Sequence, residues 1–158
     1  METNWEENFK EHLYSGLDST NVQAEQIPSY IARMDAVLDN IYSKTTTGLE
    51  LNLKECENSF NLIRNISVSM MRADGLTESE ALDICYRTGV KKNREYGSQN
   101  ILKFGIIGVV VRLADKIGRM KTLVKRDPSL RAEAAADALL DITNYATYGE
   151  MLCNSIWE

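Results

Sequence analysis

The sequence of 158 residues lacks most of the side chains from which histidine- and cysteine-based sites are built. Its only histidine is His12, and its three cysteines, Cys56, Cys85 and Cys153, lie far apart and form no Cys-x-x-Cys pair. A Cys/His zinc site and a catalytic triad built on histidine therefore have almost nothing to draw on. An odd number of scattered cysteines indicates reduced core residues, which fits a reducing cytosol.

Glycine and proline are also scarce, and long apolar runs are missing. The chain has 9 glycines and 2 prolines, few for a loop-rich β fold, and it has no Gly-x-x-x-x-Gly-Lys-[Ser/Thr] phosphate loop, which disfavours a P-loop kinase. The longest apolar run, 104–111, is far shorter than the roughly 20 residues that cross a bilayer. The acidic, polar first residues do not resemble a signal peptide. We therefore expect a cytoplasmic protein without a membrane partner.

Charge is present but unevenly spread around a net value of −5. Residues 87–131 carry 12 basic and 3 acidic side chains, a balance of +9, whereas residues 132–158 carry 5 acidic and no basic ones. Duplex nucleic acid usually binds a broad basic face of a basic domain. A basic block inside an acidic protein instead indicates a local anionic ligand, so duplex nucleic acid is not an expected partner.

Apolar residues recur at helical spacing through most of the chain, and no segment alternates as a strand does. The pattern predicts helices over 4–14, 29–43, 49–72, 78–87, 100–125 and from the Asp127-Pro128 restart to about 156. Thr77 and Glu80 form a capping box at the start of the fourth helix. The basic segment 89–98 is predicted to be a connection.

The fold class that follows is all-α. We expect one helical domain over residues 1–158, a bundle with two long antiparallel helices at its C-terminal end.

These two long helices each carry a narrow polar stripe opposite an apolar one. The first stripe comprises Gly108, Arg112, Asp115, Arg119, Thr122 and Arg126, and the second Glu133, Asp137, Asp141 and Asn144. Three carboxylates at i, i+4 and i+8 repel one another by a few tenths of a kcal/mol per pair. Their relief has to come from another element or from a bound cation.

Two interpretations of the stripes remain open. In one, the acidic face of one helix simply forms ion pairs with the basic face of the other. In the other, Asp115 joins the acids of the last helix around a divalent cation, Mg²⁺ or alternatively Mn²⁺, because such ions take carboxylate oxygens and keep sites for phosphates. Arg112, Lys116 and Arg119 would then bind those phosphates.

The motifs in this region resemble a known family. They are Tyr96-Gly97, Lys103-Phe104-Gly105, the segment Gly-Val-Val-Val-Arg-Leu-Ala-Asp-Lys-Ile-Gly-Arg over 108–119, and Asp-Ala-Leu-Leu-Asp-Ile-Thr-Asn-Tyr-Ala over 137–146. Residues 96–146 with these motifs resemble the nucleotide modification associated domain family and, more distantly, the MazG-type all-α nucleoside triphosphate pyrophosphohydrolases.

The resemblance implies a helical homo-oligomer, dimeric or tetrameric. It also implies Mg²⁺-dependent hydrolysis of a (deoxy)nucleoside triphosphate to the monophosphate and pyrophosphate. The MazG-type enzymes carry Glu-x-x-Glu and Glu-x-x-Asp pairs, whereas this chain has Arg112-x-x-Asp115 and Asp137-x-x-x-Asp141. A further ligand would come from Glu133, or from Glu55 or Glu57 if these do not simply face solvent.

The expected site residues fall into three groups. The catalytic residues are Asp115, Lys116, Asp137 and Asp141. The metal ligands are Asp115, Asp137, Asp141 and Glu133. The substrate-binding residues are Arg112, Arg119, Asn144, Tyr145, Tyr96, Asn100 and Lys103. A metal-bound hydroxide is expected to attack the α-phosphorus.

Some alternatives stay open beside this reading. Tyr145 has core packing as an alternative, and the basic run 91–94 is either a solvated loop or an entrance for phosphates. The competing function is a non-catalytic helical module that binds a nucleotide or a protein.

Overall fold

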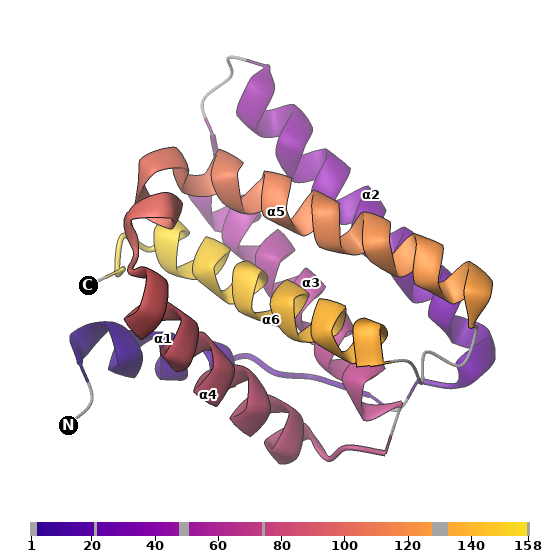
Figure 1. Ribbon diagram of the computed structural model, residues 1–158. Helices are drawn as coiled ribbons and strands as arrows, with labels where there is room; N and C mark the ends of the chain where they lie inside the picture. Colours follow the sequence, from indigo (N-terminus) through magenta and orange to yellow (C-terminus); the bar gives the residue numbers. More distant parts are fainter. Residues whose placement is uncertain (1–2, 21, 48–50, 74, 128–132, 158) are drawn as a thin grey trace.

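The computed structural model describes residues 3–20, 22–47, 51–73, 75–127 and 133–157. Within these ranges the chain forms six α-helices, one 3₁₀ turn and no strand, which confirms the all-α fold class. In chain order the elements are α1 (Asn4–Tyr14), η1 (Ala24–Gln26), α2 (Ile27–Thr46), α3 (Leu53–Arg72), α4 (Glu78–Tyr96), α5 (Gln99–Arg126) and α6 (Glu133–Cys153) (Figure 1). No helix of the described residues is both long and apolar enough to cross a membrane.

Helix α6 lies at the centre of the bundle, where α1, α3, α4 and α5 all pack against it (Figure 1). Its predicted apolar stripe, which includes Leu139 and Ile142, is buried. Every side chain from 142 to 151 except Tyr145 is buried too, polar Thr143 and Thr147 among them. The expectation of a single apolar stripe was therefore wrong for this half of α6, because a helix surrounded by four neighbours has no solvent face.

Helix α4 is longer than predicted. The expected end near residue 87 and the connection over 89–98 were wrong, because the helix continues to Tyr96. Gly89 does not break it; this glycine lets α1 approach, since a Cβ there would lie 2.6 Å from the Phe9 ring. The helix ends where Gly97 takes a positive φ of 71°, a conformation that favours glycine. The basic run 91–94 is thus placed on a helix.

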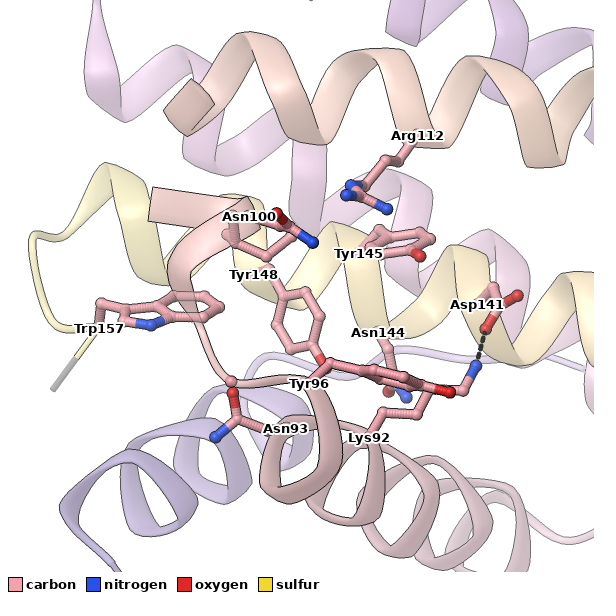
Figure 2. A pocket seen from close by; sticks show the side chains of 12 residues that line it. Lys92, Asn93, Tyr96, Asn100, Arg112, Asp141, Asn144, Tyr145, Tyr148 and Trp157 are labelled. Atoms are coloured by element: carbon pink, nitrogen blue, oxygen red, sulfur yellow. Dashed lines mark hydrogen bonds and ion pairs between the residues drawn. The ribbon is translucent and has the colours of Figure 1, made fainter. Parts of the chain in front are cut away.

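Helix α5 begins and ends within one residue of its predicted bounds, but Gly105 interrupts it with φ 57° and ψ −140°. This kink separates a first turn, which carries Asn100 and Ile101, from the straight segment 106–126. As predicted, Leu113 and Ile117 of the straight segment are buried. The part of α5 before the kink, which carries Asn100, lies near Tyr148 and Trp157 at the C-terminal end of α6 (Figure 2).

The remaining helix boundaries differ by a few residues. Helix α2 extends beyond the predicted 29–43, and α3 begins at Leu53, where Asn52 accepts a hydrogen bond from the Glu55 amide at 3.1 Å. The capping box of Thr77 and Glu80 is confirmed. The predicted helix restart at Asp127-Pro128 is described only in part. Asp127 has an extended backbone and follows the end of α5, and Pro128 lies outside the described residues.

Aromatic rings join the two ends of the chain. Trp5 stacks on Phe9 with ring centroids 5.0 Å apart, and Tyr148 meets Trp157 edge-on at 5.3 Å. All four side chains are buried. The two tryptophans therefore belong to the core of this chain. Tyr148 and Trp157, packed edge to face, form an aromatic wall beside the C-terminal end of α6.

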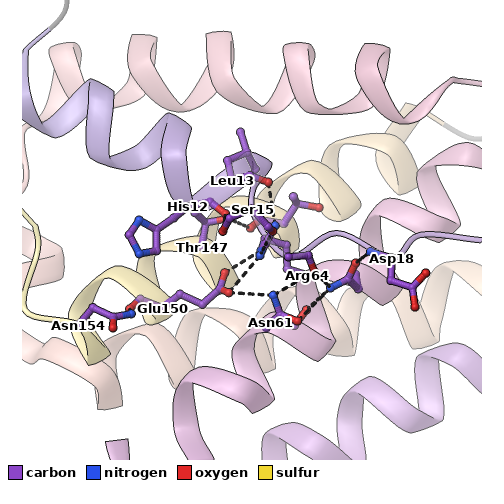
Figure 3. A network of polar contacts seen from close by, with 12 residues as sticks. His12, Leu13, Ser15, Asp18, Asn61, Arg64, Thr147, Glu150 and Asn154 are labelled. Atoms are coloured by element: carbon purple, nitrogen blue, oxygen red, sulfur yellow. Dashed lines mark hydrogen bonds and ion pairs between the residues drawn. The ribbon is translucent and has the colours of Figure 1, made fainter. Parts of the chain in front are cut away.

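A buried ion pair fixes α3 to α6 away from this wall (Figure 3). Arg64 Nε donates to Glu150 Oε2 at 2.7 Å, and its other nitrogens donate to the carbonyls of Leu13 and Ser15, both at 2.7 Å. Burial raises the pKa of the Glu150 carboxyl, and Arg64 and Asn61 oppose that rise only in part. Since every donor of this network has a structural acceptor, we assign it to the fold and not to a ligand site.

Candidate functional site

Two adjoining cavities lie where α4, α5 and α6 meet. The first, which we call the ring cavity, has a volume of about 380 Å³ and is lined by Lys92, Asn93, Tyr96, Gly97, Asn100, Ile101, Arg112, Asp141, Asn144, Tyr145, Tyr148 and Trp157. The second, the ion cavity, has a volume of about 450 Å³ and is lined by Thr88, Lys92, Lys116, Arg119, Asp137, Ala138, Leu140 and Asp141. Lys92 and Asp141 line both, so the two cavities adjoin at this pair of residues.

The ring cavity combines aromatic faces with amide groups (Figure 2). Tyr96 comes from the end of α4, whereas Tyr145 and Tyr148 come from α6 and are one turn apart. The Arg112 guanidinium lies over the Tyr145 ring, 5.7 Å from its centroid. Aromatic faces with amides at their edges are suited to a flat, polar ring such as a nucleobase.

Asn144 has a buried polar atom without a partner. The side chain is only 4% exposed, and its Nδ2 donates to the Cys85 carbonyl at 3.0 Å. This bond orients the amide, because only the nitrogen can donate, and it leaves Oδ1 without a hydrogen-bond partner among the described residues. A buried acceptor in that condition costs about 1–3 kcal/mol, so the structure keeps it at a cost to stability.

A second unpartnered atom lies at the other end of the ring cavity. Trp157 Nε1 is buried and has no hydrogen-bond partner among the described residues. Two lining residues of the ring cavity, Asn144 and Trp157, therefore each have a buried polar atom without a partner, an acceptor and a donor.

Asp141 is the centre of the ion cavity, where each carboxylate oxygen faces a lysine. Lys92 Nζ lies 2.8 Å from Oδ1, and Lys116 Nζ lies 3.3 Å from Oδ2. Burial alone would lower the pKa of Lys92, but the hydrogen bond and charge of Asp141 outweigh it and raise the pKa above its ordinary value. Lys92 is therefore a cation near neutral pH.

The ion cavity mixes phosphate-binding and metal-binding groups. Arg119 and Lys116 come from one face of α5, and Asp137 lies one turn before Asp141 on α6. Asp137 is exposed, whereas the Asp141 side chain is 16% exposed. The acidic stripe of α6 thus runs from solvent at Glu133 into the protein at Asn144.

Asp115 does not join the acids of α6. It is exposed and lines neither cavity, and no group of three or more His, Cys, Asp or Glu side chains in the described part of the chain is placed to hold a metal ion. The described residues therefore do not gather Asp115, Asp137 and Asp141 into the expected cluster. Arg112, Lys116 and Arg119, at i, i+4 and i+7, line the two cavities, whereas Asp115 lies at the edge of this face, about 60° from Arg112 and about 100° from Lys116. The ion-pairing interpretation of the two helices is thus correct for Lys116 and Asp141.

The other expected residues divide between the site and the surface. Tyr96, Asn100 and Tyr145 line the ring cavity. Glu133 is exposed at the start of α6, and Lys103 is exposed with its Nζ 5.3 Å from the Phe104 ring centroid; neither lines a cavity. The acids considered on α3 are also surface groups: Glu55 pairs with Lys44, and Glu57 pairs with Lys54.

Sequence reasoning missed four lining residues with distinct roles. Lys92 and Asn93 were recognised as part of a basic run but placed in a connection, and the continuation of α4 turns them toward α6. Tyr148 and Trp157 were not assigned to the site. Tyr148 follows Asn144 by four residues, so extending the stripe of α6 by one more turn would have found it.

Comparisons with protein-family models, with curated proteins and with solved structures gave no match for this chain. The site is therefore interpreted from its own residues.

Proposed function

We propose that the protein binds a nucleoside triphosphate across the ring and ion cavities and hydrolyses it to the monophosphate and pyrophosphate with Mg²⁺. One observation carries the proposal: a cavity of aromatic rings and amides adjoins a cavity of lysine, arginine and carboxylate, with Lys92 and Asp141 at the junction. A nucleotide has the same two halves in the same order, a planar base and a chain of phosphates.

The carboxylates of the ion cavity favour a phosphate chain that carries a metal. Asp137 and Asp141 would repel bare phosphates, whereas Mg²⁺ is commonly held by one or two carboxylates together with phosphate oxygens and water. Two acids at i, i+4 fit an ion that arrives with the nucleotide. They do not form a ready-made site for the ion alone, in keeping with the exposed position of Asp115.

The residues of the chain have distinct tasks in the proposed reaction. Lys92, Lys116 and Arg119 bind the phosphates and neutralise the charge that develops on them. Asp137 and Asp141 hold the Mg²⁺, which when bound polarises phosphate oxygens and lowers the pKa of water. Water adds to the α-phosphorus, the bond from this phosphorus to the oxygen bridging to the β-phosphate breaks, and pyrophosphate leaves with that oxygen.

The second candidate is a nucleotide-binding module without hydrolysis. The observation that favours it is the ion pairing of Asp141 with Lys92 and Lys116, which gives this carboxylate a structural role even without a metal.

Pyrophosphate release from a panel of nucleoside triphosphates and deoxynucleoside triphosphates, measured with Mg²⁺, tests the proposal. We expect Asp137→Asn and Asp141→Asn to lower the rate at least about 100-fold, as the loss of a group that stabilises the transition state does. Asp115→Asn is the matched control, since it removes an acid from the exposed side of α5, and its rate should equal that of the parent.

The outcomes separate the candidates. Equal rates in the parent and both α6 variants would contradict the catalytic assignment. Tight binding of a triphosphate in isothermal titration without pyrophosphate release would support the non-catalytic module. Absence of both binding and release would refute the nucleotide site itself.

A homo-oligomer remains part of the proposal. Ile107 and Val111 lie at i and i+4 on α5 and are 46% and 59% exposed, and Phe104, just before the Gly105 kink, is 61% exposed, so large apolar side chains remain on the surface of this helix. We expect light scattering to give a mass above that of one chain, and Val111→Glu to reduce it. A monomeric parent would refute this part alone.

A further inference from the structure

We infer that Asn144 Oδ1 accepts a hydrogen bond from a sugar hydroxyl of the bound nucleotide, so that the site distinguishes nucleotides by the hydroxyls of their sugar. The inference rests on the proposed function and extends it to the part of the substrate between the phosphates and the base.

The chemistry of the Asn144 amide requires a donor. Because Nδ2 is used by the Cys85 carbonyl, rotating the amide would set two acceptors against each other, and the present orientation is fixed. The group left over for a ligand is an acceptor, so the ligand has to present an O–H or N–H. Both hydroxyls of a sugar and the N–H groups of a base meet that requirement.

The position of Asn144 along α6 selects the sugar. It follows Asp141 by three residues, which is ~4.5 Å along the helix axis, whereas Tyr148 follows Asp141 by seven residues, ~10 Å along the axis. With the α-phosphate held near Asp141, the shorter step leads to the sugar and the longer one to the base. Figure 2 shows the same order, with Asn144 between Asp141 and Tyr148.

A ligand has to displace neighbouring side chains to reach Asn144 Oδ1. Oδ1 is shielded from solvent in the structure, although the residue lines the ring cavity. Two other lining side chains are exposed, Tyr96 by 74% and Lys92 by 49%. A shift of Lys92 from Asp141 to a phosphate would open this side of the cavity as the nucleotide enters.

Affinity measurements on the whole protein with a series of sugar-modified triphosphates test the inference. The probes carry the base that binds best and have a ribose, a 2′-deoxyribose, a 3′-deoxyribose or a 2′,3′-dideoxyribose, and Ca²⁺ replaces Mg²⁺ to slow hydrolysis. We expect the dideoxy form to bind about tenfold more weakly or worse than the ribose form, as the loss of a hydrogen bond at a buried acceptor requires. The single-deoxy forms identify the hydroxyl.

A second series tests whether the hydroxyl acts as a donor. Replacing the identified hydroxyl by an amino group, which still donates, should preserve binding. Replacing it by fluorine, which is of similar size but cannot donate, should weaken binding as much as hydrogen does. This series needs no protein variant, so it remains decisive even if substitutions at the buried Asn144 prevent folding.

A protein variant assigns the effect to Asn144. In Asn144→Ala the ribose and dideoxy forms should bind with nearly equal affinity, whereas Asn100→Ala, which changes an exposed amide of the same cavity, should keep the difference. Equal affinity of the ribose and dideoxy forms for the parent protein would overturn the inference while leaving the proposed function intact. Failure of every triphosphate to bind would overturn both.

Discussion

Lys92 Nζ lies 2.8 Å from Asp141 Oδ1, and this ion pair stands at the junction of the ring and ion cavities. It connects α4 with the central helix α6, although the lysine remains 49% exposed. Ion pairs of this exposure contribute about 0–1 kcal/mol to stability. The contact is therefore weak enough to be exchanged for a phosphate, as the proposed nucleotide site requires.

The first prediction concerns this lysine and its neighbour. Lys92→Gln should weaken nucleoside triphosphate binding about tenfold or more, because a hydrogen bond to a charged group contributes about 1.5–3 kcal/mol. Lys91→Gln removes the same charge one residue earlier, where the side chain is exposed and lines neither cavity. Isothermal titration of both variants checks the difference. Equal weakening in the two would mean that only the overall charge of α4 matters.

The second prediction concerns two glycines inside helices. A Cβ at Gly149 would lie 2.7 Å from the Phe60 ring, so Gly149→Ala should lower the free energy of unfolding by about 1–3 kcal/mol through overpacking between α3 and α6. At Gly118 on α5 an added Cβ would meet no described atom within 4 Å other than the nearby backbone of its own helix. Gly118→Ala should therefore raise the free energy of unfolding by about 0.5–1 kcal/mol. Urea unfolding measures both changes. A stabilised Gly149→Ala would show that the two helices separate easily.

Helical periodicity was sufficient to predict the fold class and most of the helices. It succeeded where one face of a helix is apolar, as at Leu113 and Ile117 of α5. It failed at Gly89. From sequence alone, a glycine that makes room for the Phe9 ring cannot be distinguished from a glycine that ends a helix. Only the packing of α1 on α4 distinguishes the two, and that contact joins segments distant in sequence.

The sequence was sufficient to single out many of the residues that line the candidate site, but not to predict how they are arranged in it. Arg112, Arg119, Asp137 and Asp141 were singled out by their spacing, and Lys116 by its place beside Asp115; all five line a cavity. Whether an acid on α5 faces α6 depends on how α5 is rotated about its own axis. With the rotation in the structure, Asp115 is exposed, whereas Lys116, the next residue, is partly buried. The rotation is set by the core side chains of both helices together, so neither stripe alone determines it.

The third prediction concerns the thiols. Burial raises the pKa of Cys85 and of Cys153 to about 12, and it raises the pKa of Cys56 as well. A thiol that is both buried and protonated is a poor nucleophile. The native protein should therefore react very slowly with Ellman's reagent at pH 8. Once it is unfolded, it should release three equivalents of thionitrobenzoate per chain, one for each cysteine. Ser43→Cys, at an exposed position of α2, supplies a fast-reacting control. Rapid reaction of a native thiol would contradict this account of the core.

The fourth prediction concerns pH and the docking of α1. Arg94 Nε donates to Glu6 Oε1 at 2.7 Å, and this hydrogen bond is the main cause that lowers the pKa of Glu6, against the opposing effect of burial. Because the pKa of this carboxyl is lower in the folded than in the unfolded protein, the pair stabilises the fold above the unfolded value near 4.5. That stability is lost as the pH falls through the folded value.

The melting temperature of Glu6→Gln should therefore lie below that of the parent at pH 7, and the gap should close as the pH falls below 4.5 and through the lowered pKa of the folded protein. Glu7→Gln is the matched control, since it removes one carboxylate from the exposed side of α1 and leaves the contact between Glu6 and Arg94 in place. A gap for Glu6→Gln that stays constant from pH 7 to pH 3 would mean that the carboxyl acts through its shape and packing, and that its charge contributes nothing to holding α1 on α4.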